Sequence, residues 1–176
     1  DYNTLVGELV HSSPTQEYLI IRNIYPDANP KLALGMDDSK MIVYSADNPA
    51  KNLTQAFDIY CTINESSGWT EPEPVANDTT PDFKPDVVYA DNRFIAVWVK
   101  LNNESLPANP DNFSEIVKYA EIAYSIYANG YWTHPELITN DSFFDYNPDV
   151  VADNDRTMVM WMKNPRNEVY VGNNAT

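Results

Sequence analysis

Acidic residues carry the most suggestive chemistry in this sequence of 176 residues, because carboxylate oxygens are the ligands that hard cations such as Ca²⁺ prefer. One aspartate recurs three residues before a proline, at Asp27, Asp82 and Asp145. A residue that returns once per structural unit most simply binds the backbone of its own turn, and copies in different units lie too far apart to share an ion. We therefore predict a turn-structural role for these residues. The candidate calcium ligands are Asp153 and Asp155, which flank a single asparagine.

The other reactive side chains have no partner at a suitable spacing. His11 and His134 stand alone, so each is expected to be a surface or hairpin residue and not a metal ligand. Cys61 is the single cysteine, which excludes a disulfide framework and a cysteine-based metal site within this chain. Its position in an apolar alternation predicts a small buried strand residue and not a reactive thiol.

Asparagine carries a different chemistry, since it accepts N-linked glycans in N-x-S/T sequons. Seven sequons are present, at Asn52, Asn64, Asn77, Asn103, Asn112, Asn140 and Asn174. This number exceeds the chance expectation and predicts an N-glycosylated surface in an extracellular or cell-surface protein. The alternative is that a chain rich in asparagine and loops carries bare sequons.

The amino-acid composition argues against some classes of binding partner. The 26 acidic residues outnumber the 11 basic ones and give a formal net charge of -15, which argues against nucleic acid and anionic membranes as partners. A hydrophobic content of 43% is sufficient for a folded core. No apolar run approaches the roughly 20 residues needed to span a bilayer, and the first residues lack the features of a signal peptide. We expect any export signal to lie outside these residues.

A long repeat determines the expected architecture. Segments 27–44, 82–98 and 145–161 each begin with Asp-x-Asn/Lys-Pro, continue through an apolar run and an Asp/Asn turn, and end in a large aromatic residue. An acid-led alternating run follows each of them, and two copies continue to a tryptophan and a proline. The aromatic residues expected to pack between neighbouring units are Tyr44, Trp69, Trp98, Trp132 and Trp161.

Each unit therefore predicts four short antiparallel strands, and helical periodicity is confined to 113–121. Repeated four-stranded units of about 55 to 63 residues are typical of β-propeller blades, in which bulky rings fill the wedge between sheets. The prediction is an all-β fold, a β-propeller fragment of about three four-stranded antiparallel blades. A two-sheet sandwich is the alternative.

Four parts of the chain follow from this interpretation. Residues 1–28 are the end of a preceding blade, 29–83 and 84–146 are blades, and 147–176 is a partial blade. Three blades are fewer than the usual minimum of about four. Either the chain is a fragment whose partners are other blades or domains of a longer chain, or several copies share one ring; we favour the fragment.

The segment DIYCTINESSGWTEPEPV (58–75) resembles the bacterial neuraminidase repeat of sialidase-like β-propellers, and the resemblance extends from residue 27 to about 172. The Asp-box of that family, Ser-x-Asp-x-Gly-x-Thr-Trp, is not intact at 64–69 or 125–132. A sialidase-like reaction implies an arginine cluster, a tyrosine nucleophile and a carboxylic acid. Arg93 and Arg156 are instead repeat residues, so the resemblance supports the fold and not the activity.

The functional prediction is an extracellular, N-glycosylated β-propeller region with a structural, adhesive or glycan- or protein-binding role, without a cofactor or catalytic residues. Segment 101–115 is the expected site of a specialised contact. The alternative is a part of a secreted sialidase-like glycan-processing enzyme whose catalytic residues lie outside this chain. A third hypothesis, an intracellular scaffold, predicts bare asparagines.

Overall fold

The structure is a computed structural model that describes residues 3–8, 17–24, 27–36, 38–48, 51, 57–65, 68–106, 114–153 and 156–168. It is built of antiparallel strands, with one short helix, α1 (Ser114–Val117), in the segment expected to be helical. Within the described ranges, no helix has the length and apolar character needed to cross a membrane.

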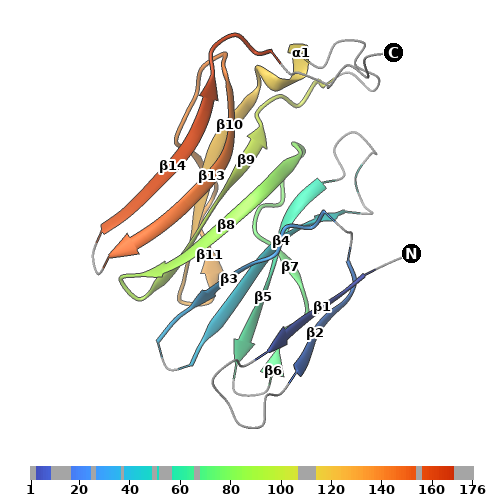
Figure 1. The fold of residues 1–176 in the computed structure, drawn as a ribbon, viewed down its shortest axis with the longest axis vertical. Coiled ribbons are helices and arrows are strands. Elements are labelled where there is room, and N and C mark those ends of the chain that lie inside the picture. The colour runs from blue at the N-terminus through green and yellow to red at the C-terminus, as the bar shows by residue number, and fades with distance from the viewer. Residues whose placement is uncertain are drawn as a thin grey trace, which may run out of the picture.

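Four sheets follow one another along the chain and lie side by side in Figure 1. The first is a hairpin of β1 (Asn3–Glu8) and β2 (Glu17–Ile24). The second contains β3 (Lys31–Leu34), β4 (Lys40–Asp47), β5 (Phe57–Glu65), β6 (Gly68–Trp69) and β7 (Glu73–Pro74). The third contains β8 (Asp82–Ala90), β9 (Arg93–Leu101), β10 (Ala120–Ala128), β11 (Tyr131–Trp132) and β12 (Glu136–Leu137). The fourth is the pair β13 (Phe144–Asp153) and β14 (Arg156–Asn164).

The second and third sheets have the same antiparallel order, and in both of them the outermost strand is divided into two short pieces. β6 and β7 both pair with β5, and β11 and β12 both pair with β10. Each piece is separated from the next by a segment containing a proline, which cannot donate to the ladder. This confirms the all-β prediction of repeated four-stranded antiparallel blades.

Left-handed residues form the turns between the first two strands of the second and third sheets. Asp38, Asp91 and Asn92 have φ angles of 60°, 47° and 59° in these hairpins. Aspartate and asparagine tolerate this region better than most residues, because their short polar side chains bond the local backbone. The prediction of Asp/Asn turns at these positions is therefore confirmed.

The Asp-x-Asn/Lys-Pro motif adopts a second left-handed conformation that recurs. The residues before the prolines, Asn29, Lys84 and Asn147, have φ angles of 50°, 53° and 50°. The β8–β9 ladder shifts register between Phe83 and Asp86, and β13–β14 shifts at the matching place. An extra residue of this kind is a β-bulge, and it bends the innermost strand of each unit.

Apolar side chains fill the spaces between consecutive sheets. Trp98 is fully buried between the second and third sheets, in one cluster with Met41 and Ile59. A second cluster joins the third sheet to β13–β14 and contains Val99 and Ile122. Sheets packed face to face through large rings are the arrangement predicted for propeller blades.

Candidate functional site

A cluster of charged side chains lies at the end of the third sheet, where β9 finishes and β8 begins. The Lys100 Nζ atom donates to Asp78 Oδ2 at 2.7 Å and to Thr80 Oγ1, and lies 3.6 Å from Asp82 Oδ1. The Trp98 indole Nε1–H donates to the same Asp82 oxygen at 2.8 Å. Asp82 is fully buried, so an ammonium and an indole surround a carboxylate that water does not reach.

The same cluster returns 63 residues later, where β13 begins and β14 ends. Lys163 Nζ lies 2.5 Å from Asp141 Oδ2 and 3.6 Å from Asp145 Oδ2. The Trp161 indole Nε1–H donates to Asp145 Oδ1 at 3.1 Å. A lysine, two aspartates and a tryptophan therefore keep one arrangement in two successive units, which identifies the cluster as a feature of the repeat.

A third acid distinguishes the two copies. In the first copy, Asp58 is fully buried and accepts hydrogen bonds from Lys51 Nζ at 2.5 Å and Asn48 Nδ2 at 2.8 Å. In the second copy, the equivalent residue is Glu121, which accepts from Thr139 Oγ1 at 2.6 Å and from the backbone N–H of Asp141 at 2.8 Å. The third acid of the second copy therefore has neutral hydrogen-bond donors where that of the first copy has the Lys51 ammonium.

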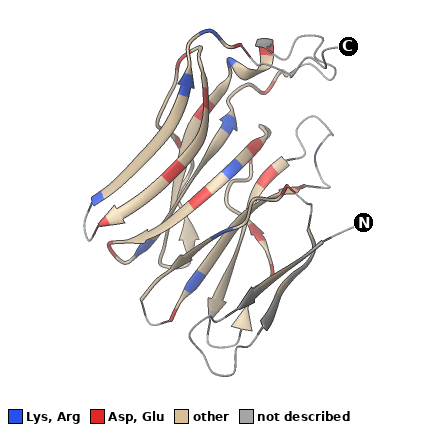
Figure 2. Cartoon of the chain, in the orientation of Figure 1, with Lys and Arg blue, Asp and Glu red and all other residues tan. Residues whose placement is uncertain are grey.

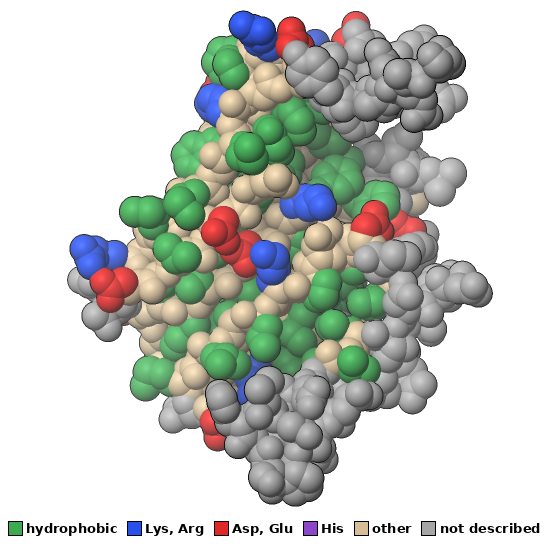
Figure 3. All heavy atoms as spheres, viewed as in Figure 1, with side chains coloured by type: hydrophobic (Ala, Val, Ile, Leu, Met, Phe, Trp, Pro, Cys, Tyr) green, Lys and Arg blue, Asp and Glu red, His purple; other side chains and the backbone are tan. Residues whose placement is uncertain are grey.

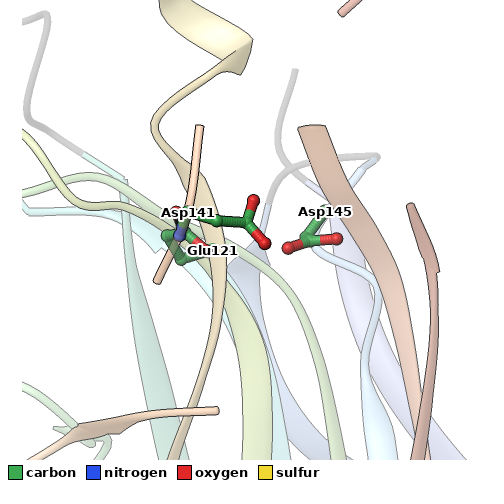
Figure 4. A group of neighbouring side chains, drawn as sticks. All are labelled: Glu121, Asp141 and Asp145. Carbon is green, nitrogen blue, oxygen red and sulfur yellow. Dashed lines mark hydrogen bonds between the residues drawn. The ribbon is translucent and has the colours of Figure 1, made fainter. Parts of the chain in front are cut away.

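The second copy consequently carries the larger negative charge. Glu121, Asp141 and Asp145 bring carboxylate oxygens within 4.8 Å of one another, and Figure 4 shows the Asp141 and Asp145 carboxylates directed toward each other. A hollow of about 280 Å³ opens beside Glu121 and Asp141, and its lining also includes Asn102, Lys118 and Tyr119. We treat this hollow, with its three acids, as the candidate functional site.

Burial raises the pKa values of these acids, and the lysines beside them lower the values. Burial raises the pKa of Asp82 to about 7 and also raises the pKa values of Glu121 and Asp145 above their usual range. The hydrogen bond from Lys163 lowers the pKa of Asp141. An acid whose pKa is raised thus lies next to one whose pKa is lowered, which is a pattern used in acid–base chemistry.

Two kinds of chemistry fit the three acids, and Lys163 limits both. Carboxylate oxygens suit a hard divalent cation, which takes six to eight oxygen ligands. The Lys163 ammonium already supplies positive charge at Asp141 and Asp145. A cation would therefore have to displace Lys163, and a substrate would have to enter beside it.

The predicted turn aspartates occupy unlike surroundings. Asp82 and Asp145 are buried and bind the indoles described above, which is a role that the sequence analysis does not assign to them. Asp27 is exposed, and its backbone carbonyl accepts from Asn29 Nδ2 at 2.7 Å. Of the candidate calcium ligands, Asp153 pairs with Arg156 at 2.5 Å, and Asp155 lies outside the described residues.

The five predicted packing rings lie between sheets or at the last of them. Tyr44 and Trp69 belong to the cluster under β1–β2, and Trp98 and Trp132 to the cluster between the second and third sheets. Trp132 also donates from Nε1 to the buried Cys61 Sγ at 3.3 Å, which joins two sheets. Trp161 in β14 is 37% exposed.

The sequons fall at different depths. Asn77 and Asn140 are exposed at equivalent positions of the loops that carry Asp78 and Asp141, whereas Asn64 in β5 and Asn103 are partly buried. The sequons outside the described residues are Asn52, Asn112 and Asn174.

Lys100, Lys163, Asp78, Asp141 and Glu121 were not among the predicted site residues. Lys100 lies 22 residues from Asp78, and Lys163 lies 22 residues from Asp141, so no local pattern connects them. The signal that could have revealed them is the constant offset of 63 residues at which each residue type recurs.

Comparison with known proteins identifies the fold. No protein-family model matches the chain, and no curated protein sequence matches it. Among solved structures, the α-L-arabinofuranosidase from Lactobacillus brevis aligns with a TM-score of 0.52 and 18% identity, over 86% of this chain and 52% of that one. The sialidase from Trypanosoma rangeli aligns with a TM-score of 0.42 and 11% identity, over 81% of this chain and 25% of that one.

The repeated four-stranded sheets and the alignment to the arabinofuranosidase define the class of protein as a β-propeller. The predicted β-propeller fold is thereby confirmed. The chain spans about half of the length of the arabinofuranosidase.

Proposed function

We propose that the chain is an N-glycosylated, extracellular β-propeller region with a structural and glycan- or protein-binding role. The observation that carries this proposal is the pair Asn77 and Asn140, which are exposed sequons at equivalent positions of two blades. A glycan needs an accessible loop asparagine, and both loops provide one beside a rigid ion cluster.

The charged clusters support a structural role. Lys100 and Lys163 each hold two acids of the same blade, and the arrangement recurs with the repeat. Catalytic groups usually break the symmetry of a repeat, because each performs a different step on one substrate. The lysine, two aspartates and tryptophan that repeat most simply hold the end of each blade together.

Glycopeptide mass spectrometry of protein isolated from its native source tests the proposal. We expect a glycan mass on the peptides containing Asn77 and Asn140, and lower occupancy at the partly buried Asn64. The variants Asn77→Gln and Asn140→Gln, expressed in the same host, should each lose one glycan and retain the fold. Bare asparagines at both exposed positions in native material would refute the proposal.

One observation favours a second candidate function, a part of a glycan-processing enzyme. Glu121 and Asp141 have pKa values shifted in opposite directions, and the cluster oxygens lie within 4.8 Å beside a hollow, which resembles the carboxyl pair of a retaining glycosidase. The aligned arabinofuranosidase acts on a glycan by its name. Hydrolysis of aryl glycosides, abolished in Glu121→Gln and kept in Asp91→Asn, would support this function; inactivity of the wild-type protein would remove it.

A further inference from the structure

The outer face of β13–β14 is apolar and uncovered. Val151, Met158, Met160 and Met162 are 49%, 61%, 49% and 53% exposed, and Figure 3 shows hydrophobic side chains over the region where Figure 1 draws these strands. Val151 pairs with Met158, so these side chains share one face of the ladder. Four exposed large apolar side chains on one face indicate a contact surface.

The repeat shows what covers such a face. Met162 lies 63 residues after Val99, which is 5% exposed and packs in the cluster that β13–β14 completes. Met160 corresponds in the same way to Val97, which has no exposed surface. The equivalent face in the middle of the chain is thus closed by the inner strands of the next blade.

A complementary uncovered face lies at the other end of the described chain. Leu32 and Leu34 in β3 are 55% and 66% exposed. Leu32 is the second residue after its proline, and the residues at this position in the next two repeats, Val87 and Val150, are 6% and 5% exposed. β3 is therefore an inner strand without the neighbour that the other inner strands have.

The β1–β2 hairpin covers only the outer strands of the second sheet and leaves the face of β3 exposed. It packs against Tyr44 in β4, Tyr60 in β5 and Trp69 beyond them, whereas β3 contributes no residue to the cluster. Figure 1 likewise draws β1 and β2 beside β5. An inner pair of strands is missing next to β1–β2, and β13–β14 is an inner pair without outer strands among the described residues.

The charged residues of the inner strands indicate what binds beside Leu32 and Leu34. The residues directly after the three prolines are Lys31, Asp86 and Asp149, on successive inner strands. Lys31 Nζ lies 3.8 Å from Asp86 Oδ1, and Asp86 Oδ2 accepts the backbone N–H of Val150 at 2.8 Å. Figure 2 shows the acidic positions on β8 and β13 next to each other. Asp149 is exposed, and it pairs in register with Met160 on the uncovered face.

We propose that the chain binds a second copy of itself head to tail, with the uncovered face of β13–β14 against Leu32 and Leu34 of the other copy. The Asp149 carboxylate then accepts a hydrogen bond from the backbone N–H of Leu32 in the other copy, as Asp86 accepts one from Val150. The residue after the proline in the neighbouring inner strand is then the basic Lys31, whereas for Asp86 it is the acidic Asp149. The contact is heterologous, and two such junctions close a pair of copies.

Each copy supplies two complete sheets among its described residues, and in the proposed contact the inner pair β13–β14 of one copy lies beside the outer pair β1–β2 of the other.

Sedimentation velocity of the 176-residue chain tests the proposal. We expect a species of twice 20.0 kDa for the wild type. Met160→Glu and Leu34→Glu should each give monomers, because each places a charge in both apolar junctions. Tyr131→Glu is the matched control, since Tyr131 is 76% exposed and lies away from both faces, and it should remain a dimer. Circular dichroism should show the same β signal in all four proteins.

Mixing the two monomeric variants distinguishes the head-to-tail contact from a symmetric one. A mixed pair contains one junction in which both faces are wild type, so the 40 kDa species should return. If β13–β14 contacts itself, Leu34→Glu remains dimeric and mixing restores nothing, which overturns the proposal. A monomeric wild type also overturns it.

A disulfide gives an independent readout. Cys61 is buried, so cysteines introduced as Leu34→Cys and Met160→Cys are the reactive thiols of the described chain. Oxidation of the double variant should link copies on a non-reducing gel, and each single variant should link far less. Equal linking of either single variant would contradict the contact.

Discussion

Replacing the buried Asp82 by asparagine should stabilise the protein at high pH and change it little at low pH. Burial raises the pKa of Asp82 from 3.8 to about 7, although Lys100 lies 3.6 Å away and lowers it. A carboxyl whose pKa is raised on folding contributes stability that is complete below its unfolded pKa and is lost as pH rises through the folded value. The contribution of Asp82 should therefore decline between about pH 4 and pH 7.

The size of the pKa shift of Asp82 determines how much stability its ionisation costs. A change from 3.8 to about 7 is about three pKa units, and each unit corresponds to about 1.4 kcal/mol, so ionised Asp82 costs about 4 kcal/mol above pH 8. Asp82 has no exposed surface, so solvent does not reduce this value. Asparagine keeps an oxygen acceptor for the Trp98 indole and removes the charge, while Lys100 retains its bond to Asp78.

Urea unfolding followed by tryptophan fluorescence at about pH 5 and about pH 9 measures this difference. We expect Asp82→Asn to be within about 1 kcal/mol of the wild type at the lower pH and about 3 to 4 kcal/mol more stable at the higher one. Asp91→Asn, at an exposed hairpin position, is the control and should follow the wild-type profile. Parallel profiles for Asp82→Asn and the wild type would show that the buried carboxylate is ionised throughout, and the reasoning would fail.

Three further predictions concern the same framework. Lys84→Asn should raise the unfolding free energy by about 0.5 to 1 kcal/mol, because Lys84 has a φ of 53° that asparagine adopts at lower cost; a thermal melt that shows a loss would contradict the bulge geometry. Trp98→Phe should lower the free energy of unfolding by about 2 to 4 kcal/mol, since it leaves a gap and removes the indole donor of Asp82. Trp161→Phe should lower it by only about 1 kcal/mol, because Trp161 is 37% exposed. Equal losses of the two variants in urea titrations would refute this difference. Burial raises the pKa of Cys61 to about 12, so its thiol should not react with a disulfide reagent near pH 8 until urea unfolds the chain, and fast reaction in the native state would be inconsistent with its position.

The sequence allowed prediction of features that are local or periodic. The hairpin turns follow from Asp and Asn at left-handed positions, and the short helix begins in the segment with helical periodicity. The repeated blades follow from motifs that return at a fixed spacing, since each unit must bury its faces on the next one. The split of the outermost strands into two pieces was not predicted, because each piece is two residues long and has no detectable alternation.

The ion clusters were not predictable from local pattern, because their members meet only after a whole blade has folded. Lys100 reaches Asp78 across 22 residues and two strands. Calcium was predicted at the tightest run of acids along the chain, whereas the structure brings carboxylate oxygens of Glu121, Asp141 and Asp145 within 4.8 Å of one another. Closeness in sequence does not reveal a site that is assembled from two strands and a loop.

The buried acids fix a register that the apolar pattern leaves open. In β9, Phe94, Ala96 and Trp98 alternate on one face, so a shift of β9 by two residues would keep an apolar face against the second sheet. The observed register pairs Asp82 with Lys100 and brings the Trp98 indole to the same carboxylate.

A shift by two residues would leave the buried carboxylate without its lysine, at a cost of several kcal/mol. Burial raises the pKa of Asp82 to about 7 even in the correct register, so ionisation of this carboxyl is disfavoured there as well. β13 and β14 repeat the pairing with Asp145 and Lys163. The penalty against this shift in register gives a physical reason why a costly buried acid recurs in successive blades.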